Sequence, residues 1–319
     1  MEKALDLDQV CTAGTKQHGQ RLDAALAVLF PLLGLRGRRR LWKRHLVLVN
    51  GIARSPAFRL HDGEVIRLVP ACPSGAEEKE VAVFSDDPPR LLARKGTLFF
   101  LYKPRGLHTE SLAGSSKPSL AGQLEWIMPN APGTGLRLLN RLDQETSGIV
   151  LATGDEDAAR HWRQWGHAGD VDKRYLAVLE GRVDAERIAR NALDLTRTRR
   201  TRVLDGEGSV LRHTRICPLA YFQAAEAPEL MPGWPADAHF TLALCCIAQG
   251  ARHQIRAHTA HIGHPLAGDI LYGTQGGTSF FLHHCRIQWP EGLVSCVPRW
   301  LASLPAPVRE LGDLQALFA

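Results

Sequence analysis

The sequence predicts an α+β protein of two domains, a small basic one followed by a larger one with a mixed sheet. Three observations lead to this prediction. The chain has 319 residues, which at about 150 residues per domain favours two domains. Positive charge is concentrated between residues 21 and 68, where ten cationic residues stand against three acidic ones, although the whole chain carries only +6. Beyond residue 95, short β-rich runs alternate with helical patterns.

The overall composition is that of a soluble globular protein. Hydrophobic residues make up 45% of the chain and charged residues 23%. No window approaches the ~20 uninterrupted apolar residues of a bilayer-spanning helix, and the first twenty residues lack the apolar block of a secretory signal. The seven cysteines are an odd number without the paired short spacings of a disulfide framework. We therefore expect reduced thiols, a cytoplasmic location and no membrane association.

The basic N-terminal domain is expected over residues 17–70. Apolar residues recur at helical spacing over residues 22–29, and a basic second helix follows. Residues 46–49 are predicted as a strand that an Asn-Gly pair turns back. Residues 61–68 close the domain with a turn and a last strand, which gives two short helices on a small sheet.

This domain resembles the alpha-L RNA-binding module of the ribosomal S-four type. The sequence pI near 9.1 also favours a polyanionic partner, with nucleic acid as the first candidate. The alternative is a basic helix whose charged face is only solvated. The cations expected to contact RNA are Arg38, Arg39, Arg40, Lys43 and Arg44.

A linker is predicted over residues 71–95, where prolines and an acidic run leave no helical period. The larger domain then spans residues 96–319. The strands predicted in it are 96–102, 148–153, 174–179 and 240–247, and the helices are 157–165 and 254–262.

The sharpest local motif is a polar stretch that leads into an apolar strand. Residues 141–148 are Arg-Leu-Asp-Gln-Glu-Thr-Ser-Gly, and Ile149, Val150 and Leu151 follow. An acid beside an arginine at the entry to a strand suggests a functional site, although Asp before Thr-Ser-Gly also makes a good turn. The same Arg-Leu-Asp tripeptide at residues 21–23 lacks the Thr-Ser-Gly and the strand, so we interpret it as helix-surface charge.

Residues 250–273 form a second group that is dense in polar side chains. In a helix that begins near His253, Arg252 and Arg256 lie four positions apart on one face, so an arginine is presented at a fixed position. Gly263 and Pro265 are predicted to end this helix.

Four motifs occur in the order and spacing of the RluA family of RNA pseudouridine synthases, which residues 96–290 resemble strongly. The motifs are Lys103-Pro104-Arg105-Gly106-Leu107, Arg141-Leu142-Asp143 with Thr146-Ser147-Gly148, Lys173-Arg174-Tyr175, and the block from Gly250 to Tyr272. The N-terminal RNA-binding module is a common companion of this family. The resemblance implies a synthase fold with a mixed, mainly antiparallel sheet and a cleft. It also implies isomerisation of uridine in RNA to pseudouridine, with no cofactor.

The resemblance also implies roles for single residues. Asp143 matches the family's catalytic aspartate, which either attacks the anomeric carbon of the sugar or assists removal of a sugar proton; both routes remain open. A nearby guanidinium would hold this carboxylate charged and oriented, and Arg256 is our candidate. Tyr175 matches the tyrosine that packs on the uracil and aids proton removal from carbon 5. The alternative for Tyr175 is a half-buried strand residue.

Three further side chains are candidates for RNA contacts. The target uridine must leave its stack, and Arg141 is placed to fill the gap and to contact a phosphate; a surface salt bridge is the alternative. Lys103 is a second candidate, although a Lys-Pro-x-Gly turn equally serves backbone needs. Arg252 is the third, because the family commonly has a basic residue after Gly250, where Ala251 stands. Arg197, Arg199, Arg200 and Arg202 form either a strip that tracks an RNA backbone or a solvated face.

The sequence departs from the family at the position before Arg141 as well. The family usually has His there, whereas this chain has Asn140. This departure puts a local hydrogen bond in doubt but leaves the acid in place.

Other functions were weighed against this one. A metallohydrolase lacks support because no His-Glu-x-x-His motif is present, so we expect no metal. Two-carboxylate glycoside hydrolysis is weak because Asp143 has Glu145 only as a sequence neighbour. A non-catalytic RNA-binding or ribosome-assembly protein on a synthase fold is the more serious alternative. The expected RNA is ribosomal rather than transfer RNA, because of the appended basic module, and the protein is expected to act as a monomer.

Overall fold

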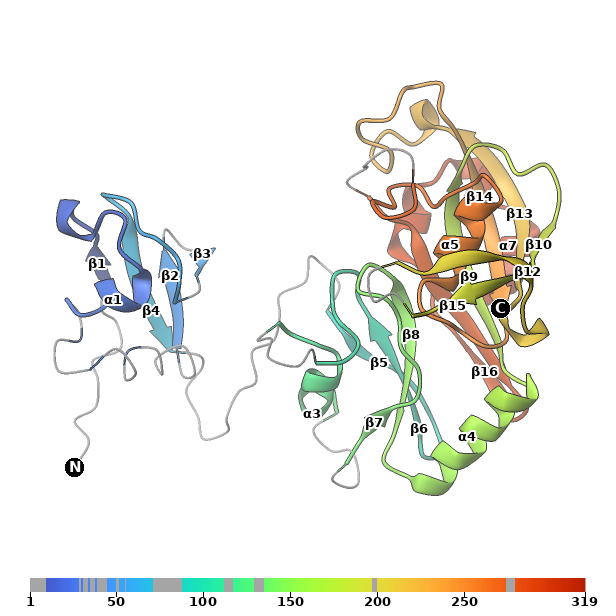
Figure 1. Ribbon diagram of the computed structural model, residues 1–319, viewed down its shortest axis with the longest axis horizontal. Coiled ribbons are helices and arrows are strands. Elements are labelled where there is room, and N and C mark those ends of the chain that lie inside the picture. The colour runs from blue at the N-terminus through green and yellow to red at the C-terminus, as the bar shows by residue number, and fades with distance from the viewer. Residues whose placement is uncertain are drawn as a thin grey trace. The chain divides into compact units, whose positions relative to one another are not determined.

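The computed structural model describes residues 10–28, 30, 34, 38, 45–49, 52–54, 56–70, 88–111, 117–128, 135–196, 200–273 and 279–318. The chain forms two compact units, Met1–Val81 and Ala82–Ala319. The first is coloured blue in Figure 1, and the second runs from green to red. No helix among the described residues is long and apolar enough to cross a membrane.

The small unit contains a four-stranded antiparallel sheet. Its strands are β1 (Val10–Thr12), β2 (His45–Val49), β3 (Ile52–Ala53) and β4 (Val65–Pro70), and its helical segments are η1 (Thr15–Gln17) and α1 (Leu22–Ala25). The strand order is β1-β4-β2-β3. Leu22 and Leu26 of the helical face pack on Val47 and Val49 of β2 in a buried core. Of the predicted helix over 22–29, only Leu22–Ala25 is helical, as α1, and residue 29 lies outside the described residues. The two predicted strands correspond to β2 and β4.

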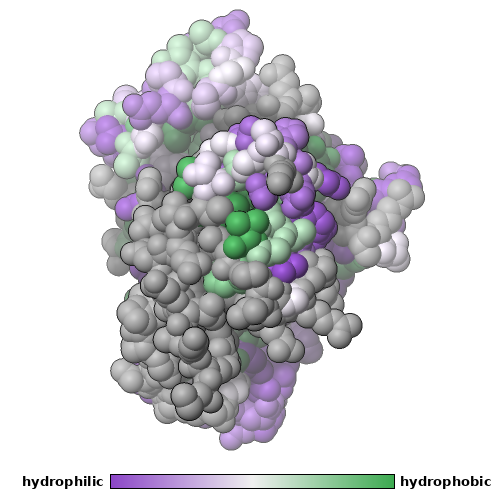
Figure 2. Space-filling view, turned by 90° about the vertical axis from the view of Figure 1, so that its left-hand side faces the viewer, coloured by the Kyte–Doolittle hydropathy of each residue, from purple (hydrophilic) through white to green (hydrophobic). Residues whose placement is uncertain are grey.

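Most of the cations expected to contact RNA, namely Arg39, Arg40, Lys43 and Arg44, lie outside the described residues. Arg38 is described, and its Nε donates a hydrogen bond to the carbonyl oxygen of Asp23 at 3.0 Å. Figure 2 shows a compact hydrophobic group on the described surface of the small unit, with hydrophilic residues above it and to its right. The alpha-L identity of this unit stays a prediction.

The expectation that residues 21–23 provide only surface charge is wrong for Asp23. Its carboxylate is buried, and it accepts hydrogen bonds from Nε and Nη2 of Arg21, both at 3.1 Å. The tripeptide lies at the start of α1, where Asp23 turns inward while Arg21 covers it from the surface. Asp23 therefore has a structural role that helical spacing alone did not reveal.

The large unit is built around a ten-stranded sheet. Its strands are β5 (Arg90–Lys95), β6 (Leu98–Lys103), β7 (Arg137–Leu138), β8 (Ser147–Thr153), β9 (Asp172–Glu180), β10 (Arg187–Ala189), β13 (Thr214–Gln223), β14 (His239–Ile247), β15 (Leu282–Trp289) and β16 (Gly292–Ser295). The main order is β10-β13-β14-β9-β15-β8-β6-β5, with β16 beside β15 and β7 beside β8. Only β15 and β8 pair in parallel; the other pairs are antiparallel. This mixed, mainly antiparallel sheet confirms the predicted α+β class.

A separate hairpin and several helices surround the sheet. The hairpin consists of β11 (Asn191–Asp194) and β12 (Arg202–Glu207). The helices are α3 (Leu124–Ile127), α4 (Glu156–Ala168), α5 (Gln254–His261), α6 (Ala306–Arg309) and α7 (Gly312–Phe318), with short 3-10 turns η3 (Ala121–Gln123), η4 (Val210–Arg212), η5 (Ala224–Glu226) and η6 (Arg299–Ser303). The predicted helices 157–165 and 254–262 correspond to α4 and α5.

Helix α4 begins and ends as helix-capping chemistry requires. The Asp155 carboxylate accepts a hydrogen bond from the backbone N–H of Ala158 at 2.8 Å, and Gly169 adopts the left-handed conformation with φ 87° after the last turn. Trp162 on its inner face contacts Trp289 of β15 edge to face, with ring centroids 6.2 Å apart. Through Trp162, helix α4 packs on one face of the sheet, against residues of β8 and β15.

The predicted linker is too long at its C-terminal end. Residues 90–95 form β5, which pairs antiparallel with β6 at the edge of the large sheet. The strand is mostly exposed, so its side chains show no apolar alternation, and Pro88 and Pro89 directly precede it. An edge strand of this kind carries little signal in its sequence, because backbone hydrogen bonds rather than buried side chains hold it.

A close backbone approach fixes the strand that follows the Arg-Leu-Asp motif. Gly148 in β8 has φ 116°, and a Cβ atom there would lie 2.3 Å from the carbonyl oxygen of His284 in β15. Only glycine allows the parallel pairing of these two strands at this point. All residues of β8 are buried. The loop before β8 therefore leads directly into a strand that is buried along its whole length.

Candidate active site

A cavity of about 310 Å³ lies where the loop before β8, the start of β9 and the segment leading into α5 meet. The side chains that line it include Asp143, Lys173, Tyr175, Arg252, His253 and Arg256. The two main motifs of the sequence, residues 141–148 and 250–273, lie more than a hundred residues apart in the chain. The fold brings both of them to one cavity.

The loop that carries Asp143 is fixed on both sides of this residue. The Thr109 hydroxyl donates a hydrogen bond to the Leu142 carbonyl oxygen at 2.6 Å and accepts one from the Leu142 N–H at 3.1 Å. On the other side, the Gln144 carbonyl oxygen accepts from the Gly106 N–H at 2.8 Å, and the Gln144 side chain donates to the Gly106 carbonyl oxygen at 3.1 Å. Thr109 was missed by the sequence analysis, since its contact spans 33 positions. These anchors fix the position from which the carboxylate of Asp143 projects.

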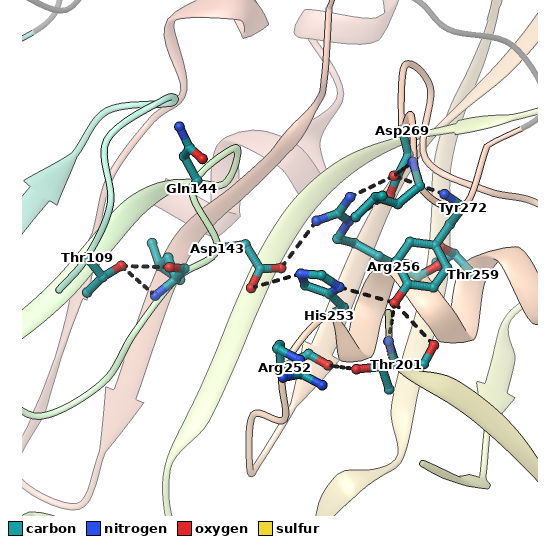
Figure 3. Close-up of polar contacts among 12 residues, drawn as sticks. Thr109, Asp143, Gln144, Thr201, Arg252, His253, Arg256, Thr259, Asp269 and Tyr272 are labelled. Carbon is teal, nitrogen blue, oxygen red and sulfur yellow. Dashed lines mark hydrogen bonds and ion pairs between the residues drawn. The ribbon is translucent and has the colours of Figure 1, made fainter. Parts of the chain in front are cut away.

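The Asp143 carboxylate faces two basic side chains (Figure 3). Its Oδ2 atom lies 3.7 Å from Nη1 of Arg256, and its Oδ1 atom lies 3.8 Å from Nε2 of His253. The side chain is 20% exposed, so a ligand in the cavity can reach it. Positive charge at this distance in a partly buried site stabilises a negative carboxylate. The predicted approach of Arg256 to Asp143 is present, whereas the approach of His253 was not anticipated.

Arg256 is held in place by Asp269, a residue that the sequence analysis did not single out for a role. Both side chains are buried, and Nε and Nη2 of Arg256 donate to the two Asp269 oxygens, each at 2.7 Å. The backbone N–H groups of Leu271 and Tyr272 also donate to Asp269 Oδ1. Burial works against the charge of Arg256, but the hydrogen bonds and charge of Asp269 raise its pKa. The bidentate pair leaves Nη1 of Arg256 directed at Asp143.

His253 connects the Asp143 carboxylate to a second polar group. Its Nδ1 atom lies 3.1 Å from the hydroxyl of Tyr272, which in turn donates to the Thr201 carbonyl oxygen. His253 has φ 54° at the start of α5, the one positive φ outside glycine among the described residues. Burial lowers its pKa, with Asp143 acting in the opposite direction. A non-glycine residue in this conformation, next to the carboxylate of Asp143, points to a constraint set by the site.

Tyr175 forms one apolar wall of the cavity. Its ring stacks on the imidazole of His284, with centroids 4.5 Å apart and planes at 16°. Burial lowers the pKa of His284 to about 3, so this imidazole is neutral. Burial, and to a lesser extent the charge of Asp143, raises the pKa of Tyr175, so its hydroxyl keeps its proton at neutral pH. The side chain is therefore a flat neutral surface, as stacking on a base requires.

The expectation that Lys103 contacts RNA does not agree with its position. Its side chain is fully buried, and Nζ donates hydrogen bonds to the carbonyl oxygens of Pro104, Leu107 and Gln144 at 2.9, 2.7 and 3.1 Å. The three acceptors use all three ammonium hydrogens. Lys103 thus ties its own turn to the loop of Asp143, which is the backbone role that the sequence left open.

Lys103 should make stability depend on pH. Burial lowers its pKa from 10.5 to about 7, against smaller opposing effects of Asp143 and Glu145. Above about pH 7 the unfolded chain binds more protons at this residue than the folded chain, so the free energy of unfolding rises with pH by at most about 1.4 kcal/mol per unit. We expect Lys103→Met to have a smaller slope than the wild type between about pH 7 and about pH 8.5 in urea denaturation. Lys173 also titrates in this range, but it does so equally in both proteins. If the free energy of unfolding rose with pH equally steeply in wild type and Lys103→Met, this effect of Lys103 would be ruled out.

The remaining candidates lie at or near the cavity. Arg141 is exposed at its edge, and Arg252 is half-buried in it, with Nη2 donating to the Leu195 carbonyl oxygen at 3.2 Å. Asn140, which stands where the family usually has His, accepts a hydrogen bond from the Leu151 N–H at 2.7 Å. The amide of Asn140 thus ties the segment before Arg141 to β8. Of the arginine strip, Arg197 and Arg199 lie outside the described residues, whereas Arg200 and Arg202 are exposed.

The titratable side chains in the described ranges form no group of three or more that could hold a metal ion. Five cysteines, Cys217, Cys245, Cys246, Cys285 and Cys296, are free thiols.

Comparison with known proteins agrees with the site. Residues 97–261 match the model of the RNA pseudouridylate synthase family. Ribosomal large subunit pseudouridine synthase D of Xylella fastidiosa is 30% identical over 330 residues, which cover 92% of this chain and 90% of that protein. The protein of the same name from Escherichia coli is 28% identical over 82% of this chain and 75% of its own length.

The fold has solved counterparts as well. The structure of human RNA pseudouridylate synthase domain containing 1 matches with a TM-score of 0.54 and 20% identity, over 76% of this chain and 91% of that one. The family match covers just over half of the chain and includes Asp143, Tyr175 and Arg256. The chain belongs to the RNA pseudouridylate synthase family and is an isomerase that converts uridine in RNA to pseudouridine.

Proposed function

We propose that the protein isomerises uridine in large-subunit ribosomal RNA and that Asp143 starts the reaction. The ribosomal substrate is supported by the names of the relatives that are 28–30% identical to this chain. The observation that carries the role of Asp143 is its position, partly exposed to the cavity and 3.7 Å from the guanidinium of Arg256. This arrangement supplies a fixed carboxylate next to space for a nucleoside.

The reaction needs three things from the cavity. The uridine must turn out of its helix, and exposed Arg141 at the edge is suited to occupy the gap and to contact a phosphate. The C1′–N1 bond must then break while Asp143 either bonds to C1′ or removes the proton from C2′. Finally the uracil must turn so that its carbon 5 bonds to C1′, and the cavity must hold the base meanwhile. The ring of Tyr175 offers the face on which it can stack.

Tyr175→Phe should separate stacking from the function of the hydroxyl. The ring and its contact with His284 remain, so RNA affinity should change little. If the hydroxyl aids proton removal, its loss should lower the rate about 10²-fold or more. Tyr175→Ala should also weaken RNA binding because the stacking surface is lost. Single-turnover rates and filter-binding affinities of both variants provide the comparison. A Phe variant with the wild-type rate would assign Tyr175 to stacking alone.

The substrate can be tested in cells. Pseudouridines in ribosomal and transfer RNA should be mapped at single-nucleotide resolution with and without this gene. We expect one or more positions in the large-subunit RNA to lose the modification, and a plasmid copy of the gene to restore it. A loss confined to transfer RNA would contradict the ribosomal assignment, and unchanged maps would contradict the activity in those RNAs.

The basic small unit is proposed to add affinity through phosphate contacts, which do not depend on sequence and weaken as salt increases. A ribosomal RNA substrate supports the proposal that the enzyme acts in the cytoplasm, which its cysteine content also predicts. Action as a monomer remains part of this proposal.

A further inference from the structure

Lys173 lines the cavity but has no part in the steps described above. It lies at the start of β9, two positions before Tyr175, so both side chains project from the same face of the strand. Its neighbours across the sheet are Ile247 of β14 and Ile287 of β15. Lys173 is half-buried between these two apolar neighbours, beside the surface on which the base would stack.

Lys173 has no acidic partner for its charge among the described residues. Its Nζ atom donates one hydrogen bond, to the carbonyl oxygen of Ala248 at 3.3 Å, which leaves two of its three ammonium hydrogens for a ligand. Arg256 in the same cavity is neutralised by Asp269, and the adjacent Arg174 by Asp172 at 2.7 Å. Burial lowers the pKa of Lys173 to about 8, so the group is mostly charged at neutral pH.

A half-buried ammonium without a counter-charge is costly in the free protein, because it loses hydration that its one hydrogen bond to Ala248 only partly replaces. The same group becomes favourable when negative charge develops beside it during a reaction. Interactions that form mainly in the transition state raise the rate of the chemical step, and they are strongest where water is largely excluded. The position of Lys173 therefore suits an anion that appears only during turnover.

Pseudouridine formation generates such an anion. When the C1′–N1 bond breaks, its electron pair goes to the uracil, where the negative charge spreads over N1, O2 and O4. This holds whether Asp143 bonds to C1′ or takes the proton from C2′. Afterwards carbon 5 bonds to C1′. The Asp143–C1′ bond breaks at this step in the first route, and C2′ regains its proton from Asp143 in the second. Carbon 5 then loses its proton, and N1 gains one. The base is neutral again at the end, so the negative charge is transient.

We propose that Lys173 is a catalytic residue that stabilises the departing uracil anion, by hydrogen-bonding to the edge of the base while its face stacks on Tyr175. This role rests on the proposed function of the cavity. Lys173 donates hydrogen bonds and supplies charge but transfers no proton. A competing explanation is structural, because the hydrogen bond to Ala248 also ties β9 to the end of β14.

The test uses the sensitivity of the reaction to the leaving group. Two synthetic fragments of large-subunit RNA would carry uridine or 5-fluorouridine at the target position found by the mapping experiment. Fluorine withdraws electrons and stabilises the uracil anion without help from the protein. Cleavage of the C1′–N1 bond is followed in single turnovers with full-length enzyme, by nuclease digestion and mass spectrometry of the nucleosides.

We expect Lys173→Met to slow cleavage at uridine about 10²-fold or more but at 5-fluorouridine by less than about tenfold. Lys173→Arg keeps the charge and should retain most of the wild-type rate. Arg174→Met is the matched control, since it removes a cation from the opposite face of the same strand and should slow neither substrate. Lys173→Gln, which keeps a hydrogen-bond donor, replaces the Met variant if that protein does not fold.

Equal losses on both RNAs would overturn the proposal in favour of the structural role, and a charge-free variant with the wild-type rate would overturn it outright. Wild-type enzyme and Asp143→Asn are measured alongside. An inactive wild type or an active Asn variant would refute the proposed function of the cavity, and with it the role of Lys173. The role of Lys173 alone would be refuted if Lys173→Met kept the wild-type rate while the wild type was active and Asp143→Asn was inactive.

Discussion

Asp143→Asn is expected to lower the single-turnover rate of pseudouridine formation by about 10⁴-fold or more. The amide fills the same space and can keep the backbone contacts of Leu142 and Gln144 in place, so the fold should not change. It can neither attack C1′ nor accept a proton from C2′ efficiently. RNA affinity should stay close to that of the wild type, because the contacts proposed for binding involve other side chains.

The matched control for this variant is Glu145→Gln. Glu145 lies two positions further along the same loop, where it forms a largely exposed ion pair with Arg105 at 2.9 Å. Such pairs contribute little, so this variant should retain nearly the full rate. Equal losses in both variants would show that the loop tolerates no change of charge, and they would withdraw the special role of Asp143.

Asp269→Ala should have the largest effect on stability. Removing this carboxylate leaves the guanidinium of Arg256 buried without its partner and leaves two backbone N–H groups without an acceptor. Breaking a buried ion pair from one side costs about 3–5 kcal/mol in the free energy of unfolding. Activity should fall as well, because the atom of Arg256 that faces Asp143 is no longer held. Urea denaturation and single-turnover rates below the unfolding transition measure the two effects separately.

Asp157→Asn is the comparison for this stability effect. Asp157 pairs with Arg160 on the exposed face of α4, and both side chains are largely in solvent. Its loss should change the free energy of unfolding by less than about 0.5 kcal/mol and leave the rate unchanged. If Asp269→Ala lowered the free energy of unfolding as little as Asp157→Asn, another group would have to compensate the charge of Arg256.

The sequence was sufficient for the main elements of the site because their signals are local. A polar Arg-Leu-Asp segment before an apolar strand, and a helix that starts near His253, were both predicted and are both present. That Asp143 and Arg256 meet followed from the family resemblance together with the need of a carboxylate for a cation. The geometry then adds the distance of 3.7 Å.

The residues that sequence analysis missed are those whose role depends on long-range packing. Asp269 reaches Arg256 only because the chain turns back after α5, and no periodic pattern marks this. A lysine is rarely found fully buried, so an exposed role for Lys103 was a fair expectation from composition alone. Its burial depends on three carbonyl groups that converge from two segments. The exposed edge strand β5 escaped for a related reason, since backbone pairing leaves no pattern in its side chains.

We expect the uridine to react in the cavity between Asp143 and Tyr175. This expectation is tested most directly by a crystal structure of the full-length enzyme bound to its target RNA fragment with 5-fluorouridine at the modified position. We expect an everted base stacked on the ring of Tyr175, with C1′ of its sugar in contact with an oxygen of Asp143. A target base bound elsewhere, or a sugar that lies away from this carboxylate, would contradict it.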